Sequence, residues 1–383
     1  MKKIGLSCIV KNEATVILKM LNSVSSFIDY WCIVDTGSTD GTQQIIKNYF
    51  QEKNILGELI EIPWKNFSTS RNKALDGLKG KVDWGFWIDA DETLTFKSEF
   101  EISQFKNKLT DEYSGGFIDV LHGPLIYKRM QLFNLKYPWK WIGPVHEVLV
   151  NDIKHKYLNM NDFVVNYHTT GHSWTSQTQE QKYEKYIKLL TDYIEENPTQ
   201  DNSRWIFYLA QSYRDTGSKK YYPDVIKWYQ KRLEINTGYN EEKYISALYI
   251  ARTKRLIGWN TGLGYSETEV LDSFMKCTQY NTERIEHFEP IIEHYQMHKD
   301  WENAYIFSSY TINKKLKDFL FSEPQIYQWK IYDMHAMNCF YTKRYDEMKK
   351  YGEILQQILM TTNFIPTQHH ERVKTNLKFY LPS

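Results

Sequence analysis

Two aspartates separated by one residue follow an apolar run, and this spacing could place two carboxylates on one metal ion. The run 84–88 leads directly into Asp89-Ala90-Asp91-Glu92. Residues two apart in a strand point to the same side, so Asp89 and Asp91 could converge on a cation if the strand continues or the loop curls around it. Mg²⁺ and Mn²⁺ prefer oxygen ligands, and Mg²⁺ is usually held by one or two carboxylates plus substrate phosphates. The alternative for this pair alone is a solvated turn after a strand.

Polar residues also follow the other apolar runs of this region. Asn12 and Glu13 come after the run 4–10, and Asp35 ends the run 31–34. Apolar runs alternate here with segments of helical spacing, which predicts an α/β fold with a doubly wound, mostly parallel sheet. Ligands bind beyond the carboxyl ends of the strands in such sheets. We therefore expect these side chains to gather at one edge of the sheet.

The elements that would position these residues can be placed along the chain from the hydrophobic pattern. The expected strands are 4–10, 31–34, 59–62, 84–88, 117–121, 125–133 and 163–167, and the expected helices of this part are 14–27, one entered near Thr42, and 68–78. From about residue 178 the pattern becomes long and helical. Degenerate tetratricopeptide-like spacing there predicts four helix pairs, at 203–236, 243–277, 287–318 and 329–360. A single pair cannot bury its apolar face, so stacking into a solenoid is expected.

Length and composition limit the classes of protein that the chain can belong to. Its 383 residues are enough for two domains, and 48 basic against 47 acidic residues give no reason to expect nucleic acid as a partner. The longest apolar runs are far short of the roughly 20 residues that cross a bilayer. The first residues resemble a strand more than a signal peptide. The four cysteines lie in no metal-binding spacing, which favours buried thiols in the cytoplasm.

The N-terminal half resembles glycosyltransferase family 2, whose members have the GT-A fold. The resemblance covers roughly residues 1–175 and lies in Val10-Lys11-Asn12-Glu13, Val34-Asp35-Thr36-Gly37-Ser38-Thr39-Asp40-Gly41-Thr42, Phe67-Ser68 with Arg71-Asn72 and Ala74, Ile88-Asp89-Ala90-Asp91-Glu92, and Val145-His146-Glu147. A helical-repeat C-terminus is similar to the subgroup that includes bacterial peptide S-glycosyltransferases. We accordingly expect a GT-A catalytic domain at 1–177 and a tetratricopeptide-like domain at 178–383.

The resemblance implies a binding site for a nucleotide sugar. It gives the nucleotide pocket to Val10, Asn12, Glu13 and Ala90, and contact with the uracil or ribose to Asp35. Arg71 would approach the nucleotide or its diphosphate, since a guanidinium suits phosphate recognition. A surface ion pair is the alternative for Arg71.

The resemblance also implies metal ligands. Asp89 would contact the ribose or the metal, and Asp91 would bind the divalent cation, Mn²⁺ or Mg²⁺, that bridges the diphosphate. A downstream histidine often completes such a site, and the family pattern favours His168 over His172. A histidine in a core or surface role is the alternative.

Family 2 enzymes invert the anomeric centre, so the acceptor needs a general base. Glu147 is the candidate base, with His146 supporting it or facing the diphosphate. A purely structural carboxylate is the alternative for Glu147. Related enzymes tend to carry an arginine where this chain has Gln131, and Arg129, on the same face of a strand, could supply that charge from one step away.

The resemblance implies an inverting, metal-dependent hexosyltransferase. Its donor would be a UDP-sugar, with UDP-glucose the first choice, and its acceptor a peptide, a protein or a glycan. Trp139 and Trp141 could stack on a sugar or pack in the core, and the helical domain could present the acceptor or form a homodimer. Two other functions remain open: a repeat-based interaction protein whose transferase half is weak or inactive, and a nucleotidyltransferase, although Lys11-Asn12-Glu13 is not the Gly-rich loop that a triphosphate needs.

Overall fold

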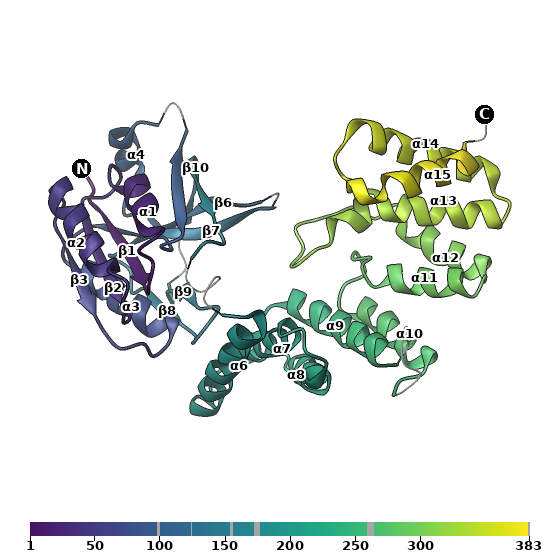
Figure 1. Cartoon of the computed structure of the whole chain (residues 1–383), viewed down its shortest axis with the longest axis horizontal. Helices are drawn as coiled ribbons and strands as arrows, with labels where there is room; N and C mark the ends of the chain where they lie inside the picture. Colours follow the sequence, from purple (N-terminus) through teal and green to yellow (C-terminus); the bar gives the residue numbers. More distant parts are fainter. Residues whose placement is uncertain (98–99, 124, 154–155, 172–176, 259–263, 382–383) are drawn as a thin grey trace. The chain divides into compact units, whose positions relative to one another are not determined.

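The computed structural model describes residues 1–97, 100–123, 125–153, 156–171, 177–258 and 264–381. The chain forms two compact units, Met1–Glu196 and Asn197–Ser383 (Figure 1). The sequence analysis divides the chain after residue 177, whereas the units divide after Glu196. The difference is helix α6 (Gln179–Glu196), whose Tyr186 ring packs against Phe67 and His146 of the first unit, at centroid distances of 6.3 and 6.0 Å.

An eight-stranded sheet forms the centre of the first unit. In spatial order its strands are β3 (Gly57–Glu61), β2 (Tyr30–Asp35), β1 (Ile4–Val10), β4 (Trp84–Trp87), β7 (Leu125–Asn134), β6 (Tyr113–His122), β10 (Lys156–Tyr167) and β5 (Glu92–Phe96). The first four are parallel, β7 is antiparallel to both its neighbours, β6 and β10 are parallel, and β5 is antiparallel to β10. The predicted α/β class with a mostly parallel sheet is confirmed. A separate hairpin joins β8 (Lys140–Ile142) to β9 (Val148–Val150).

Helices cover both faces of this sheet. Helices α1 (Ile17–Val24) and α2 (Thr42–Lys53) share one hydrophobic core with the buried side chains of β1, while α3 (Phe67–Leu78) shares another with Cys32 of β2 and with the β8–β9 hairpin. A short helix, α4 (Ile102–Lys108), packs with the first of these cores. Helix α3 approaches β2 closely, because a Cβ on Gly77 would come within 2.3 Å of the Cys32 sulfur. This close packing fixes α3, the helix that carries Arg71.

The second unit consists of helices packed around one continuous core. Helices lie in all four predicted pairs: α7 (Ser203–Asp215) with α8 (Tyr222–Glu234), α9 (Asn240–Gly258) with α10 (Glu267–Met275), α11 (Phe288–Met297) with α12 (Trp301–Thr311), and α13 (Ile331–Tyr341) with α14 (Tyr345–Thr361). A further helix, α15 (His370–Tyr380), packs on α13 and α14. The core runs without interruption from Phe207 to Tyr380, as expected of helix pairs that bury their apolar faces on one another. In the part of the chain that the structure describes, no helix has both the length and the apolar character that a membrane span requires.

Candidate active site

A cavity of about 480 Å³ lies in the first unit at the carboxyl ends of the parallel strands. It is lined by Ile9, Val10, Lys11, Glu13, Thr36, Trp64, Phe67, Arg71, Asp89, Ala90, Asp91, His146, Tyr167, Gln177, Lys182, Tyr183, Lys185 and Tyr186. The loops after β1, β2 and β4 therefore meet at this edge of the sheet, where open α/β sheets bind their ligands. The predicted residues Val10, Glu13, Arg71, Asp89, Ala90, Asp91 and His146 are among those that the cavity brings together.

Asp35 is a buried carboxylate with one oxygen engaged and the other not. Its Oδ1 accepts hydrogen bonds from the backbone N–H groups of Gly37 and Ser38, each at 2.8 Å. Its Oδ2 is buried and, within the described residues, has no hydrogen-bond partner. A buried acceptor without a donor is uncommon in folded proteins, and it fits a site where a ligand supplies the donor. Asp35 does not itself line the cavity, but the next residue, Thr36, does.

Asn12 connects the loop after β1 to the loop after β2. Its backbone N–H donates to the Ser38 hydroxyl and its side-chain oxygen accepts from the Thr39 N–H, both at 2.8 Å. It has a left-handed backbone, with φ of 56°, which is uncommon outside glycine and tends to occur at functional sites. Glu13 donates its backbone N–H to Thr42 Oγ1 at 2.9 Å and lines the cavity. Asn12 thus braces the wall of the cavity and is not one of its lining residues.

Arg71 lies between two acidic residues that are far apart in the sequence. Its Nη2 is 2.7 Å from Asp89 Oδ1, and its Nε is 2.5 Å from Glu147 Oε1. The Arg71 side chain is only 8% exposed, so the alternative that Arg71 forms an ion pair on the surface is wrong. One guanidinium therefore fixes the carboxylate after β4 and the carboxylate of the His146-Glu147 motif relative to each other. Glu147 does not line the cavity, whereas His146 does.

Two tryptophan rings, nearly perpendicular to each other and 5.1 Å apart at their centres, lie beside this guanidinium. The Arg71 Cζ is 4.8 Å from the Trp87 ring centre and 5.1 Å from that of Trp141. The Asn72 side-chain amide exchanges two 2.8 Å hydrogen bonds with the Trp141 backbone, which attaches the β8–β9 hairpin to α3. Trp139 and Trp141 are both nearly fully buried, so the core-packing alternative holds for both rings and sugar stacking does not.

The three acidic residues after β4 have different surroundings. Asp91 lines the cavity, and burial, followed by the nearby Asp89 charge, raises its pKa to about 6. Its Oδ2 accepts from the Gly171 N–H at 3.2 Å, and a Cβ at Gly171 would approach that oxygen to 2.6 Å. Glu92 is fully buried, and both its oxygens accept from Arg129 Nη2, at 2.8 and 2.7 Å. Asp91 is thus the acid of this motif that faces the cavity without an arginine partner among the described residues.

Arg129 and Gln131 of β7 have different partners in the structure. Arg129 forms an ion pair with Glu92, and its Cζ is 4.5 Å from the centre of the Trp87 ring. Gln131 is buried and donates to the Trp87 carbonyl at 3.0 Å. Neither lines the cavity, so the charge of Arg129 acts on the loop through Glu92.

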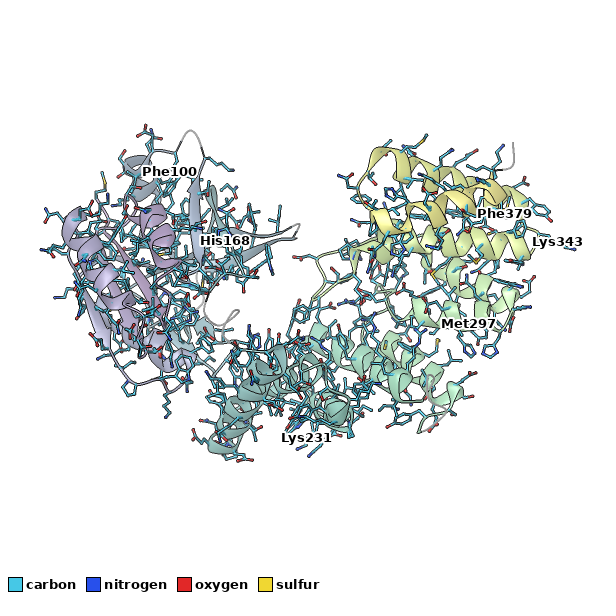
Figure 2. The ribbon with its side chains drawn as sticks, viewed as in Figure 1. Phe100, His168, Lys231, Met297, Lys343 and Phe379 are labelled. Carbon is cyan, nitrogen blue, oxygen red and sulfur yellow. The ribbon has the colours of Figure 1, made fainter. Side chains whose placement is uncertain are left out.

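His168 is not among the residues that line the cavity, although the preceding residue, Tyr167, is. His168 follows β10 directly and is exposed, and its Nε2 is 3.1 Å from Thr93 Oγ1 (Figure 2). Among the described residues, the ligand atoms of Asp89, Asp91 and His168 do not form a group within 4.8 Å of one another. His172 lies outside the described residues.

Helix α6 contributes lining residues that the sequence analysis missed. Lys182, Tyr183, Lys185 and Tyr186 all reach the cavity from one face of this helix. Burial lowers the pKa of Lys182, against the opposing effect of Asp91. Two lysines and two tyrosines at i, i+1, i+3 and i+4 share one face of a helix, and this spacing is the signal in the sequence that could have identified them. The predicted division after residue 177 places them in the helical domain, before its first predicted helix pair.

Comparisons with known proteins find relatives among glycosyltransferases and repeat proteins. The SPbeta prophage-derived glycosyltransferase SunS of Bacillus subtilis is 27% identical over 254 residues, covering 64% of this chain and 57% of SunS. A TPR repeat-containing protein of Synechococcus elongatus is 30% identical over 155 residues, covering 40% of this chain and 36% of that protein. The chain thus spans little more than half the length of SunS and about a third of the other relative.

Among solved structures, S. aureus TarS 1–349 aligns with 84% of this chain and 97% of its own, at 12% identity. The TM-score of 0.34 is too low to support an assignment. The model of glycosyl transferase family 2 matches residues 8–131, which include β1, β2, β4 and the loops that line the cavity. The match to glycosyl transferase family 2 thus lies within the N-terminal unit, Met1–Glu196.

Proposed function

We propose that this chain is an inverting, metal-dependent glycosyltransferase that moves a hexose from a UDP-sugar, with UDP-glucose the first choice, to a peptide, protein or glycan. The observation that carries the proposal is the cavity at the carboxyl ends of β1, β2 and β4 in the unit that matches glycosyl transferase family 2, lined by Asp91, Arg71 and the lysines of α6. The carboxylates of such a cavity can bind a cation and accept hydrogen bonds from the hydroxyl groups of a sugar. Its cationic side chains can bind phosphates.

The nucleoside would bind beside Asp35. The buried Oδ2 of this residue is an acceptor that lacks a donor within the described residues. The N–H of a uracil ring or the hydroxyl of a ribose supplies such a donor. Val10 and Glu13 would form the adjacent wall, and the loop held by Asn12 would keep that wall in place.

The divalent cation would bind at Asp91. This carboxylate faces the cavity, while Asp89 is engaged by Arg71, so Asp91 fits a Mg²⁺ or Mn²⁺ site that takes its other ligands from phosphates and water. A bound cation supplies positive charge to the leaving diphosphate. Lys182 and Lys185, on the opposite wall, would add charge-assisted hydrogen bonds to the same group. His168, exposed and bonded to Thr93, is not part of this proposed site.

Glu147 would accept the proton of the attacking acceptor group. Its carboxylate is mostly buried and held by Arg71 at 2.5 Å, which orients it. The same guanidinium holds Asp89, so the proposed base and the donor-binding loop would keep a fixed separation. His146, which lines the cavity, would contact the diphosphate.

The second unit would present the acceptor. Helical-repeat arrays expose extended surfaces that bind extended partners, which favours a peptide or protein as acceptor, and such a surface could also form a homodimer. The four cysteines are free thiols buried in the structure, which suits action in the cytoplasm.

Calorimetric titration with UDP, GDP and TDP, each with Mn²⁺ or with EDTA, tests the donor site. We expect UDP to bind best, and Mn²⁺ to strengthen its binding. Asp35→Asn keeps the Oδ1 acceptor for Gly37 and Ser38 but replaces Oδ2 with an N–H₂ donor, so UDP binding should weaken at least about tenfold.

Asp119→Asn, which alters an exposed carboxylate paired with Lys128 on β6 and β7, serves as the control and should bind UDP as the wild type does. Absence of binding by every nucleotide would favour the alternative function, a repeat-based interaction protein with an inactive transferase unit.

A further inference from the structure

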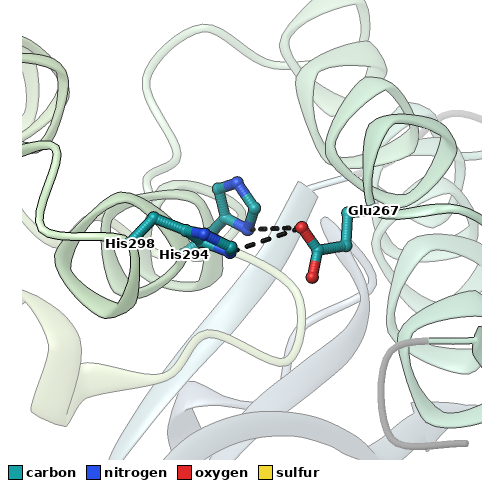
Figure 3. Close-up of side chains that lie close together, drawn as sticks. All are labelled: Glu267, His294 and His298. Carbon is teal, nitrogen blue, oxygen red and sulfur yellow. Dashed lines mark ion pairs between the residues drawn. The ribbon is translucent and has the colours of Figure 1, made fainter. Parts of the chain in front are cut away.

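A second group of metal-ligand side chains lies in the helical unit, apart from the candidate active site. Glu267 is in the first turn of α10, His294 is in the last turn of α11, and His298 is the residue at which α11 ends. Figure 3 shows both imidazoles turned toward the Glu267 carboxylate. No part of the proposed transferase mechanism uses this group.

The ligand atoms are close to the separations that a tetrahedral ion requires. Glu267 Oε2 is 3.3 Å from His298 Nε2 and 4.0 Å from His294 Nδ1, and all three ligand atoms lie within 4.8 Å of one another. Zn²⁺ binds nitrogen and oxygen at about 2.0–2.2 Å, so two ligands in a tetrahedral site lie roughly 3.4 Å apart. Small side-chain rotations would bring all three to that distance.

The spacing and the chemistry both suit a transition metal. His294 and His298 are four residues apart, which places them on one face of a helix end. Two imidazole nitrogens and one carboxylate oxygen form a set that Zn²⁺ binds in proteins, with a water molecule in the fourth position. The C-terminal end of a helix carries partial negative charge and so favours a cation beside the two histidines.

Burial and charge support the same assignment. The His294 side chain is mostly buried, at 10% exposed, and its Nδ1 lies on the side of the Glu267 carboxylate. The Glu267 and His298 side chains are about half exposed, at 49% and 51%, so an ion can reach them from solvent. Arg255 is the nearby cation that opposes binding, but its guanidinium is paired with Glu293 at 2.9 Å.

The other three-ligand group among the described residues is already satisfied. In it, His335 Nδ1 is 2.8 Å from Ser308 Oγ, and its Nε2 is 3.1 Å from Glu347 Oε1. The third member, Cys339, is fully buried, and burial raises the pKa of its thiol to about 12. A metal there would need a thiolate that the surroundings disfavour.

We propose that Glu267, His294 and His298 bind one Zn²⁺ ion that links the start of α10 to the end of α11. The ion connects two helices of the second unit that are in contact with each other. It is independent of the proposed transferase activity, because none of its ligands lines the cavity of the first unit.

Titration of the full chain with Zn²⁺, followed by calorimetry and by thermal unfolding, tests the site. Asp91→Asn is used as the background, so that the candidate cation site of the first unit does not contribute. In that background we expect one Zn²⁺ to bind and to raise the unfolding temperature. Since loss of a residue that merely supports a metal ligand costs 10–100-fold in affinity, loss of a ligand itself in His298→Gln should cost at least about a hundredfold.

Two further measurements keep the result interpretable. Asp272→Asn changes an exposed carboxylate of α10 that pairs with Lys276, and Zn²⁺ affinity should not fall in this variant. Replacement of Zn²⁺ by Co²⁺ should give the visible absorption of a tetrahedral nitrogen and oxygen site, and the absorption should disappear in His298→Gln. Absence of saturable Zn²⁺ binding in the Asp91→Asn background, or unchanged binding in His298→Gln, would overturn the proposal.

Discussion

At the scale of single residues, the site depends on Arg71. This side chain holds Asp89 and Glu147 and contacts the rings of Trp87 and Trp141. A planar guanidinium with several N–H donors can make both ion pairs at once while it contacts aromatic rings, which suits it to this place better than an ammonium group. The arrangement joins a residue of the loop after β4 to one of the β8–β9 hairpin.

Loss of this charge should be costly. Arg71→Met leaves Asp89 and Glu147 without their shared partner, and breaking a buried ion pair costs about 3–5 kcal/mol. We therefore expect the first unit of Arg71→Met to unfold at a clearly lower urea concentration than that of the wild type. The first unit of Arg71→Lys should unfold at an intermediate concentration. Lys47→Met, which removes an exposed pair with Glu61 in the same unit, should cost less than about 1 kcal/mol. Equal losses in Arg71→Met and Lys47→Met would contradict the network.

We expect the Asp91 carboxylate to lower the free energy of unfolding of the metal-free protein. Its pKa lies near 6 in the folded chain, against an ordinary value of 3.8. Between these values the folded state binds more protons than the unfolded state, so the metal-free protein loses stability as the pH rises from about 4 to 6. Asp91→Asn removes this loss and should be more stable by about 1 kcal/mol at pH 7, allowing for the partial exposure of the group.

Urea denaturation in EDTA at pH 4 and at pH 7 measures the effect. The advantage of Asp91→Asn should be present at pH 7 and absent at pH 4. An advantage of the same size at both pH values would mean that proton binding at Asp91 is not its cause.

Much of the residue set follows from the sequence, because the aspartates and the Arg71 and His146-Glu147 motifs occur in recognisable order. The partners of these residues do not follow from it. Nothing in the linear order indicates that Arg71 bridges Asp89 and Glu147, or that Glu92 takes Arg129. Such pairings depend on which strands become neighbours, here β4 beside β7.

At the scale of elements, α6 completes the cavity. Its Lys182 and Lys185 face the loops after β1 and β4 from a helix that is distant in sequence from both. The strands and the four helix pairs were predictable because each has its own hydrophobic period. The role of α6 was not, because an amphipathic helix has the same period whether it packs in a repeat or on a cavity.

The lysines of α6 should matter for the diphosphate. Lys182→Met removes a charge-assisted contact worth about 1.5–3 kcal/mol, so UDP should bind roughly ten- to a hundredfold more weakly. Lys188→Met on the same helix changes an exposed lysine that pairs with Asp192, and it should leave the affinity unchanged. Calorimetry compares the two variants directly, and similar affinity in both would place the diphosphate elsewhere.

At the scale of the whole molecule, the chain is two units with separate cores. Among the described residues, all those that line the cavity belong to the unit Met1–Glu196, although the family model ends at residue 131. A unit that ends at Glu196 includes the lining residues of α6, which a domain that ends at residue 177 would lack.

The fragment 1–196 should fold and bind UDP with an affinity close to that of the full chain. The fragment 1–177 lacks the four lining residues of α6 and should bind at least about tenfold more weakly. Circular dichroism verifies that each fragment is folded before calorimetry. If the shorter fragment binds UDP as well as the longer one, α6 is not part of the donor site.

We propose above that the first unit is an active transferase whose cation binds at Asp91. The most direct test measures release of nucleoside diphosphate from a panel of UDP-, GDP- and TDP-sugars, with Mn²⁺ or with EDTA, by the wild type and by Asp91→Ala. We predict release from a UDP-sugar that requires Mn²⁺ and falls at least about a hundredfold in the variant, since the cation stabilises the charge of the leaving group. Release that is equally fast in Asp91→Ala, or that persists unchanged in EDTA, would contradict the account.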